Sequence, residues 1–199
     1  MNTSQLENFV ASDVRTSEKF RGVLTADALP RQPCSGQTDA AYIVNTDPFG
    51  KPGEHWVAFY VDPRLHRVEF FDSFAASSPS VYNTAWTKWA RTKALCGTAR
   101  PVCLLQSRRV IQSANSATCG LYCLYYLVRR SRGTTLEQIV NELSASGART
   151  LNDRQILAWW RRQNRRDPAA STFFNSTGQG CCKYGDCQKR HPELCRRSH

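Results

Sequence analysis

Residues 112–130, QSANSATCGLYCLYYLVRR, join a polar loop of small residues to an apolar helix, and a cysteine stands at the joint. From position 121 the apolar side chains recur at helical spacing, so we expect a helix that begins near Cys119 and ends at the pair Arg129-Arg130. At a helix N-terminus the unpaired backbone N–H groups and the helix dipole favour an anion, which lowers the pKa of a thiol. Cys119 is therefore a candidate nucleophile.

The loop before this helix has the residues to complete such a site. Ser116, Ala117 and Gly120 are small enough to let a substrate backbone approach, and Gln112 is an uncharged donor for a developing oxyanion. The alternative is that Cys119 is a buried structural cysteine in a loop rich in Ser, Ala and Gly. This stretch alone does not decide between the two interpretations.

The composition is typical of a folded globular protein. The chain has 199 residues, of which 41% are hydrophobic, and this suits one main domain with an appendage. No apolar run is long enough to span a membrane, and the N-terminus MNTSQLENFV lacks the pattern of a signal peptide, so we expect no membrane association and synthesis in a reducing compartment. The 9 cysteines then favour chemistry or metal binding over a disulfide framework.

Positive charge is concentrated in the C-terminal third. The chain carries 27 Lys and Arg against 16 Asp and Glu, a net charge of +11. From Arg129 to the end, 14 basic residues stand against 6 acidic ones, which is +8 of that total. This excess suits binding to nucleic acid, although solvated helix faces also account for much basic charge.

The segments WVAFYV and RVEFFD flank the turn DPRLH and predict an antiparallel hairpin. If Asp62 faces Arg67, then His55 and Asp72 lie on one face of the hairpin as diagonal neighbours. A slip of one residue in the register would move Asp72 to the other face. This arrangement provides a general base and the carboxylate that orients it.

Histidine is scarce, which narrows the choice of a general base. Of the four histidines, His66 lies in the hairpin turn and His191 and His199 lie in the tail, so only His55 stands at the edge of a core strand. For a lone histidine, a structural residue at a strand end would be the preferred interpretation. The accompanying carboxylate and cysteine favour a catalytic one.

Four motifs, AYIVNT, GEHWVAF, FFDSF and NSATCGLYC, carry a family resemblance. Together with Gln112 seven residues before Cys119, they resemble the adenovirus-type endopeptidases, the adenain family. That family lies within the wider group of cysteine proteases that includes the SUMO-processing enzymes. The resemblance covers about residues 40–127. This chain differs from many family members at Asp72, where they have Glu.

The resemblance implies an α+β fold, with a mixed or antiparallel sheet packed against helices and the nucleophile at the N-terminus of a central helix. It also implies a viral cysteine endopeptidase that cleaves viral precursor proteins near Gly-Gly or Gly-X-Gly during virion maturation, in the virion and the host nucleus. In this mechanism Cys119 attacks the carbonyl, His55 transfers protons, Asp72 orients His55 and Gln112 stabilises the oxyanion. No cofactor is required for the chemistry, and we expect a monomer.

The resemblance further implies activation by DNA and by a short viral peptide that forms a disulfide with an enzyme cysteine. The matching position is Cys103 in RPVCLLQ, although the loop that follows is shorter than the family pattern. The alternative is a buried strand cysteine within Val102 to Leu105. Cys123, one helical turn after Cys119, is expected in the core.

Residues 131–167 predict two helices, the first capped by Thr134 or Thr135 and the second by Asn152 or Asp153. A cluster of arginines follows the second helix and is a candidate contact for DNA phosphates, or else a solvated helix end. Its members are Arg161, Arg162, Arg165 and Arg166. We expect the protease domain to span residues 1–167.

Residues 168–199 form a basic tail that contains a possible zinc site. Three thiolates and one imidazole at short intervals can converge on a tetrahedral Zn²⁺, which would supply the folding energy of so short a segment. The predicted ligands are Cys182 (or Cys181), Cys187, His191 and Cys195. The alternatives are a disordered tail with free thiols or cysteines paired in disulfides.

Two other functions remain open from the sequence. One is a deubiquitinating or SUMO-processing protease with the same chemistry, and the other is an inactive virion protein that binds nucleic acid. The spacing of Gln112 and Cys119 favours the viral protease over the first, and the complete set of catalytic residue types argues against the second.

Overall fold

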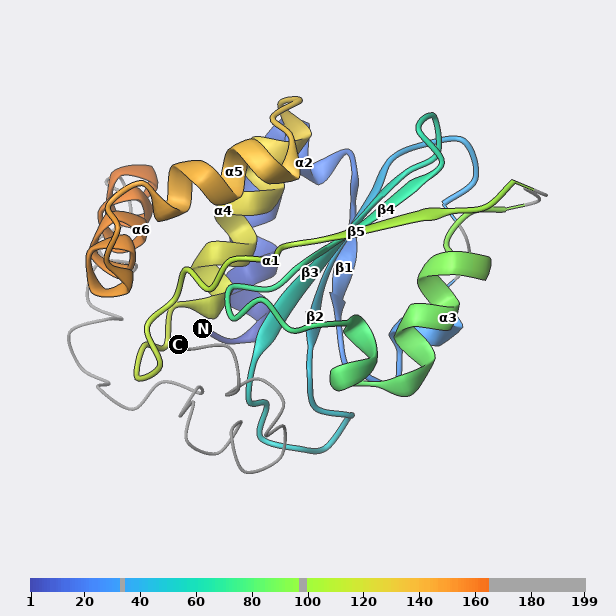
Figure 1. Cartoon of the computed structure of the whole chain (residues 1–199), viewed down its shortest axis with the longest axis horizontal. Helices are drawn as coiled ribbons and strands as arrows, with labels where there is room; N and C mark the ends of the chain where they lie inside the picture. Colours follow the sequence, from blue (N-terminus) through green and yellow to red (C-terminus); the bar gives the residue numbers. More distant parts are fainter. Residues whose placement is uncertain (33–34, 97–99, 165–199) are drawn as a thin grey trace.

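A computed structural model describes residues 1–32, 35–96 and 100–164 of the chain. Figure 1 shows a twisted sheet with a layer of helices on each side, so the predicted α+β class is confirmed. The helices are α1 (Thr3–Ser12), α2 (Val14–Ser17), α3 (Thr84–Thr92), α4 (Cys119–Ser131), α5 (Leu136–Ser144) and α6 (Arg149–Gln163), with short 3-10 turns at Leu29–Arg31 and Pro79–Val81.

The described residues form one sheet of five strands in the order β1-β2-β3-β4-β5. They are β1 (Phe20–Leu24), β2 (Ala40–Asn45), β3 (Trp56–Asp62), β4 (Arg67–Phe71) and β5 (Cys103–Gln106). The outer pairs are parallel and the inner pairs antiparallel. The predicted hairpin register is confirmed, because Asp62 pairs with Arg67 and Ala58 with Phe71.

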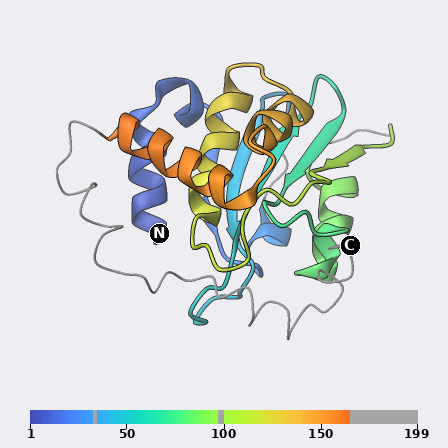
Figure 2. The same ribbon diagram turned by 60° about the vertical axis from the view of Figure 1, so that its left-hand side comes forward.

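Each face of the sheet has its own core, so β3 is buried along its whole length. On one face, Ile43, Ala58 and Phe71 pack against α4 and its neighbouring helices. On the other face, Phe59 packs against Trp86 and Trp89 of α3, mainly by edge contacts between the rings. Figure 2 shows α3 separated by the sheet from α4 and α6.

Helix α4 is the central helix of the larger core, and it begins at Cys119 as predicted. Its C-terminal end is anchored by Arg130, which bonds to Asp62 and Glu69 at 3.0 Å each and lies over the ring of Tyr60. These two carboxylates hold the buried cation at the end of the helix where the dipole also favours positive charge. The C-terminal end of α4 is thus fixed against β3 and β4.

The helix predictions need one correction. Thr135 caps α5 in a full capping box, as expected, but α6 begins at Arg149 after Ala148, so Asn152 and Asp153 are not its cap. Both lie inside the helix and are buried. The Asn152 side chain donates to the Ile111 carbonyl and the Asp153 side chain accepts from the Ser113 N–H, both in the loop before α4, so residue types that suit a cap make tertiary contacts here.

None of the helices in the described ranges is long and apolar enough to cross a membrane. Cys96 is disulfide-bonded, so the expectation that the cysteines serve chemistry or metal does not hold for this one.

Candidate active site

The two strands of the central hairpin bring His55 and Asp72 together. His55 directly precedes β3, and Asp72 directly follows β4. Because these strands pair in the predicted register, the two side chains meet, and His55 Nε2 lies 2.7 Å from Asp72 Oδ1. Their side chains are 1% and 0% exposed, so the pair is shielded from water.

Asp72 is held by donors on both of its oxygens. Oδ1 accepts from the backbone N–H of Phe74 in addition to the contact with His55, and Oδ2 accepts from the N–H of Ala76 and the hydroxyl of Tyr82, all at 2.9 Å. Although burial raises the pKa of a carboxyl, His55 and these donors outweigh it and lower the pKa of Asp72. Asp72 is therefore a fixed anion beside the imidazole.

Cys119 occupies the first position of α4, where a backbone N–H lies outside the helix's own hydrogen-bond ladder. Its thiol forms a hydrogen bond with the His55 side chain. Because Asp72 takes Nε2 of the ring, Nδ1 is the nitrogen left for the sulfur. Burial alone would lower the pKa of His55, but the negative charges of Asp72 and Cys119 raise it to about 10. A protonated imidazole beside a thiolate is the arrangement that this electrostatic environment favours.

Gln112 lies completely buried at the start of the loop that leads to Cys119. Its Oε1 accepts from the Ser73 hydroxyl, and its Nε2 donates to the Ser116 carbonyl, each at 2.6 Å. These contacts fix which end of the amide carries the donors. Since an amide nitrogen has two N–H groups, the second one is available to an oxyanion.

Cys123 lies in the core, as predicted. Its side chain is 1% exposed, its Sγ donates to the backbone carbonyl of Trp56 at 3.3 Å, and burial raises the pKa of its thiol well above the ordinary value. A buried neutral thiol is a poor nucleophile. The two cysteines of α4 are thus chemically distinct.

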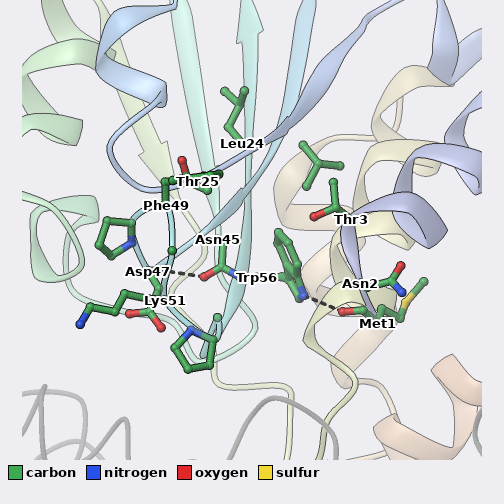
Figure 3. A pocket seen from close by; sticks show the side chains of 15 residues that line it. Met1, Asn2, Thr3, Leu24, Thr25, Asn45, Asp47, Phe49, Lys51 and Trp56 are labelled. Carbon is green, nitrogen blue, oxygen red and sulfur yellow. Dashed lines mark hydrogen bonds between the residues drawn. The ribbon is translucent and has the colours of Figure 1, made fainter.

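A cavity of about 460 Å³ lies beside Trp56, the residue after His55. Figure 3 shows its lining, with Met1 next to the Trp56 indole and the chain segment around Phe49 on the opposite side. The indole Nε1 donates to the Met1 carbonyl at 3.2 Å, which fixes the ring at the cavity wall. Phe49, another lining residue, is 85% exposed, so an apolar side chain of the cavity faces solvent.

Three of the remaining predicted site residues, Cys103, Arg161 and Arg162, belong to the described part of the chain, and none of them is among the contacts given above for the site. Cys103 is exposed on β5, so the alternative that it is a buried strand cysteine is wrong. Arg161 and Arg162 are exposed near the end of α6. Several other candidates fall outside the described residues, namely Arg165, Arg166, Cys181, Cys182, Cys187, His191 and Cys195. Within the described ranges no group of His, Cys, Asp or Glu could hold a metal ion.

Three residues that support the site were missed in the sequence. Ser73 orients the Gln112 amide, Tyr82 bonds to Asp72, and the ring of Phe74 lies 4.8 Å from the His55 ring. Ser73 and Phe74 belong to the FFDSF motif, which also contains Asp72, and they could have been found because they follow Asp72 directly. Nothing in the local sequence around Tyr82 indicates its partner.

The raised pKa of His55 predicts how stability depends on pH. Because the pKa in the folded protein, about 10, lies above the ordinary 6.5, the contribution of the charged imidazole is fully present below pH 6.5 and is lost as the pH rises toward 10. In a Cys119→Ala background, which removes the titrating thiol but keeps the larger effect of Asp72 on the pKa of His55, we expect the free energy of unfolding to fall as the pH rises above 6.5. Urea unfolding at pH 6, 8 and 9.5 measures it.

The matched control is the double variant Cys119→Ala, His55→Gln, which has no imidazole to titrate. The difference in unfolding free energy between the two proteins should shrink as the pH rises. A difference that is constant between pH 6 and 9.5 would contradict the charged state of His55.

The chain is similar in sequence to known viral proteases. Residues 34–169 match the family model described as adenovirus endoprotease. The protease of human adenovirus A serotype 12 is 36% identical over 114 residues, which cover 55% of this chain and 50% of that protein. The protease of bovine adenovirus 4 is 32% identical over 88 residues, which cover 43% and 44%. The chain thus spans about half the length, or less, of these relatives.

Two solved structures show similarity at lower identity. The ASFV pS273R protease is 18% identical with a TM-score of 0.45, over 66% of this chain and 59% of that one. ChlaDub1 from Chlamydia trachomatis is 13% identical with a TM-score of 0.45, over 81% and 79%.

Proposed function

The chain belongs to the adenovirus endoprotease family, and we propose that it is a viral cysteine endopeptidase with Cys119 as its nucleophile. The observation that carries the proposal is the buried His55–Asp72 pair at 2.7 Å, with His55 bonded to the thiol at the start of α4. An anion, a base and a nucleophile in this order are the parts of a cysteine protease triad.

The first half of the reaction is acyl transfer to the enzyme. The Cys119 thiolate attacks the scissile carbonyl carbon, and the electron pair of the C=O bond moves to the oxygen. The Gln112 amide and the Cys119 backbone N–H stabilise this oxyanion, and in comparable sites such a donor is worth roughly 2.7–4 kcal/mol. When the oxyanion collapses, the C–N bond breaks and the His55 imidazolium protonates the leaving amine. A thioester on Cys119 and a neutral His55 remain.

The second half hydrolyses the thioester. Neutral His55 removes a proton from a water molecule, whose oxygen attacks the thioester carbonyl. The C–S bond then breaks, the carboxylic acid product leaves, and the thiolate and imidazolium are restored. Asp72 stabilises the imidazolium in both halves through its contact with Nε2.

We propose viral precursor proteins as the substrates, with cleavage near Gly-Gly or Gly-X-Gly during virion maturation, in the virion and the host nucleus. Family membership supports viral precursor proteins as the substrates. The cavity beside Trp56 supports an extended substrate chain, because it is lined by Trp56, which follows His55 directly, and by the exposed Phe49. The cleavage preference rests on the family resemblance.

An activating peptide has a suitable docking position on β5. This strand is at the end of the sheet order, so one of its edges has no neighbouring strand in the described part of the chain. Cys103 is exposed there, and an extended peptide that adds a strand can place its own cysteine beside it. A mixed disulfide would then lock the added strand in place.

DNA is the second proposed activator. Arg161 and Arg162 are exposed at the end of α6, and the chain carries a net charge of +11. Contacts to phosphates carry no sequence information, so the binding should be independent of sequence and should weaken steeply with added salt.

One assay tests these proposals together. The purified protein is incubated with Gly-Gly-containing peptides, with and without duplex DNA, and with and without a short strand-forming peptide that carries one cysteine. We expect cleavage that increases with both additions. Cys103→Ser should abolish only the increase caused by the cysteine peptide. Arg161→Ala with Arg162→Ala should weaken only the increase caused by DNA.

The controls use positively charged side chains elsewhere on the surface. Arg91→Ala with Lys93→Ala, at the end of α3, removes the same amount of charge and should leave the DNA effect unchanged. An equal loss in both double variants would show that only net charge matters. Faster cleavage of ubiquitin or SUMO fusions than of Gly-Gly peptides would favour the processing-protease alternative.

A further inference from the structure

The loop between the proposed oxyanion donor and the proposed nucleophile is held by a carboxylate from a distant helix. Asp153 of α6 is 7% exposed and points at this loop. Its Oδ2 accepts from the backbone N–H of Ser113 at 3.2 Å and from the Ser113 hydroxyl, and its Oδ1 accepts from the hydroxyls of Thr118 at 3.1 Å and Tyr122 at 2.9 Å. All four donors lie in the loop or in the first turn of α4.

The two oxygens of this carboxylate accept hydrogen bonds from opposite ends of the loop. Ser113 follows Gln112 directly, and Thr118 precedes Cys119 directly. One rigid, planar group therefore sets the distance between the two ends. The neighbouring Asn152 adds a bond of 3.0 Å from its Nδ2 to the Ile111 carbonyl, so α6 contacts the chain on both sides of Gln112.

We propose that Asp153 is a positioning residue, which fixes the placement of Gln112 relative to Cys119. The inference rests on the proposed function, because it assigns a role in stabilising the oxyanion. The two donors must meet one oxygen atom, and a displacement of about 1 Å can cost on the order of 10²-fold in rate. Ser and Ala predominate in this loop, so few of its own side chains are large enough to hold its shape. The hydrogen bonds of Asp153 supply that restraint from α6.

Two substitutions separate geometry from charge. Asp153→Ala removes both acceptor oxygens and leaves the Ser113 N–H and three hydroxyls without this partner, so we expect kcat to fall by about 10-fold to 100-fold with KM little changed. Asp153→Asn can place its oxygen on the Ser113 N–H, while the hydroxyls of Thr118 and Tyr122 rotate to accept from its NH₂ group. Asn should therefore restore most of the lost kcat.

The matched control removes a second buried carboxylate at the far end of β3. Asp62 is 4% exposed and bonds to Arg130, with no contact to the loop. Asp62→Ala should lower the stability of the protein but leave kcat unchanged at a temperature where all variants are folded. Circular dichroism on each sample confirms that condition.

Alkylation of Cys119 by iodoacetamide gives a readout that does not use the oxyanion donors. Its rate reports the thiolate and His55 alone, and the buried start of α4 holds Cys119 in place. In Asp153→Ala we expect the alkylation rate to stay near the wild-type value while kcat falls. That split distinguishes positioning of Gln112 from general damage to the site.

Several outcomes would overturn the inference. They are an unchanged kcat in Asp153→Ala, an equal loss of kcat in Asp62→Ala, no recovery in Asp153→Asn, or a fall in alkylation as large as the fall in kcat. A wild-type protein that is alkylated at Cys119 but cleaves no peptide would instead contradict the proposed function, and with it the role assigned to Asp153.

Discussion

Cys119→Ala is expected to abolish peptide cleavage, with a loss of roughly 10⁶-fold in kcat by analogy with the removal of a protease serine. The variant should remain folded, because alanine is smaller than cysteine and Cys119 lies at a helix start that the rest of α4 holds. Within the described residues, no other thiol bonds to His55. The rate of hydrolysis of a fluorogenic peptide, measured beside a circular dichroism spectrum, tests this.

The matched control is Cys123→Ala on the same helix. Cys123 donates to the Trp56 carbonyl and its pKa is raised by burial, so its removal should cost stability and leave most of kcat. Retained activity in Cys119→Ala combined with lost activity in Cys123→Ala would reverse the assignment of the nucleophile.

Asp72→Asn is expected to lower kcat by about 10⁴-fold, the loss seen when a triad aspartate is replaced by asparagine. The contacts of Asp72 explain why its amide cannot substitute. The backbone N–H groups of Phe74 and Ala76 point at different oxygens of the carboxylate, so either orientation of an amide places its NH₂ against a fixed donor. The amide also lacks the charge that stabilises the imidazolium of His55.

Tyr82→Phe is the control for this prediction, because it removes one donor from Asp72 and keeps the carboxylate. We expect a much smaller loss of kcat than in the Asn variant. If Asp72→Asn cleaves peptides at the wild-type rate, another group orients His55 and the triad assigned here is incorrect. Asp72→Glu is expected to be poorly tolerated, since it adds a methylene group to a completely buried site.

The central fold elements could be predicted because their signals are local. The hairpin has two runs rich in β-branched and aromatic residues around a short turn, so its register follows from the facing pair Asp62 and Arg67. That register alone brings His55 to Asp72. Helix α4 could be predicted equally well, because the change from small polar residues to helical periodicity marks its start at Cys119.

The parts that could not be predicted depend on contacts between distant segments. The residue type of Asp153 near a helix start predicts a helix cap, but its partners are 31 to 40 residues away in the chain. Tyr82 contacts Asp72 only because the chain after β4 folds back over the site. Tertiary contacts of this kind override local propensity, and no pattern in a single sequence reports them.

The most direct test of the account is to identify the residue that becomes acylated. The protein is incubated with a Gly-Gly peptide that carries an electrophilic group at its C-terminus, then digested and analysed by mass spectrometry. We predict one adduct per chain, on Cys119, which is strongly reduced in His55→Ala and unchanged in Cys123→Ala and Cys103→Ser. An adduct on Cys103 or Cys123 in the wild-type protein, or equal labelling of Cys119 with and without His55, would contradict it.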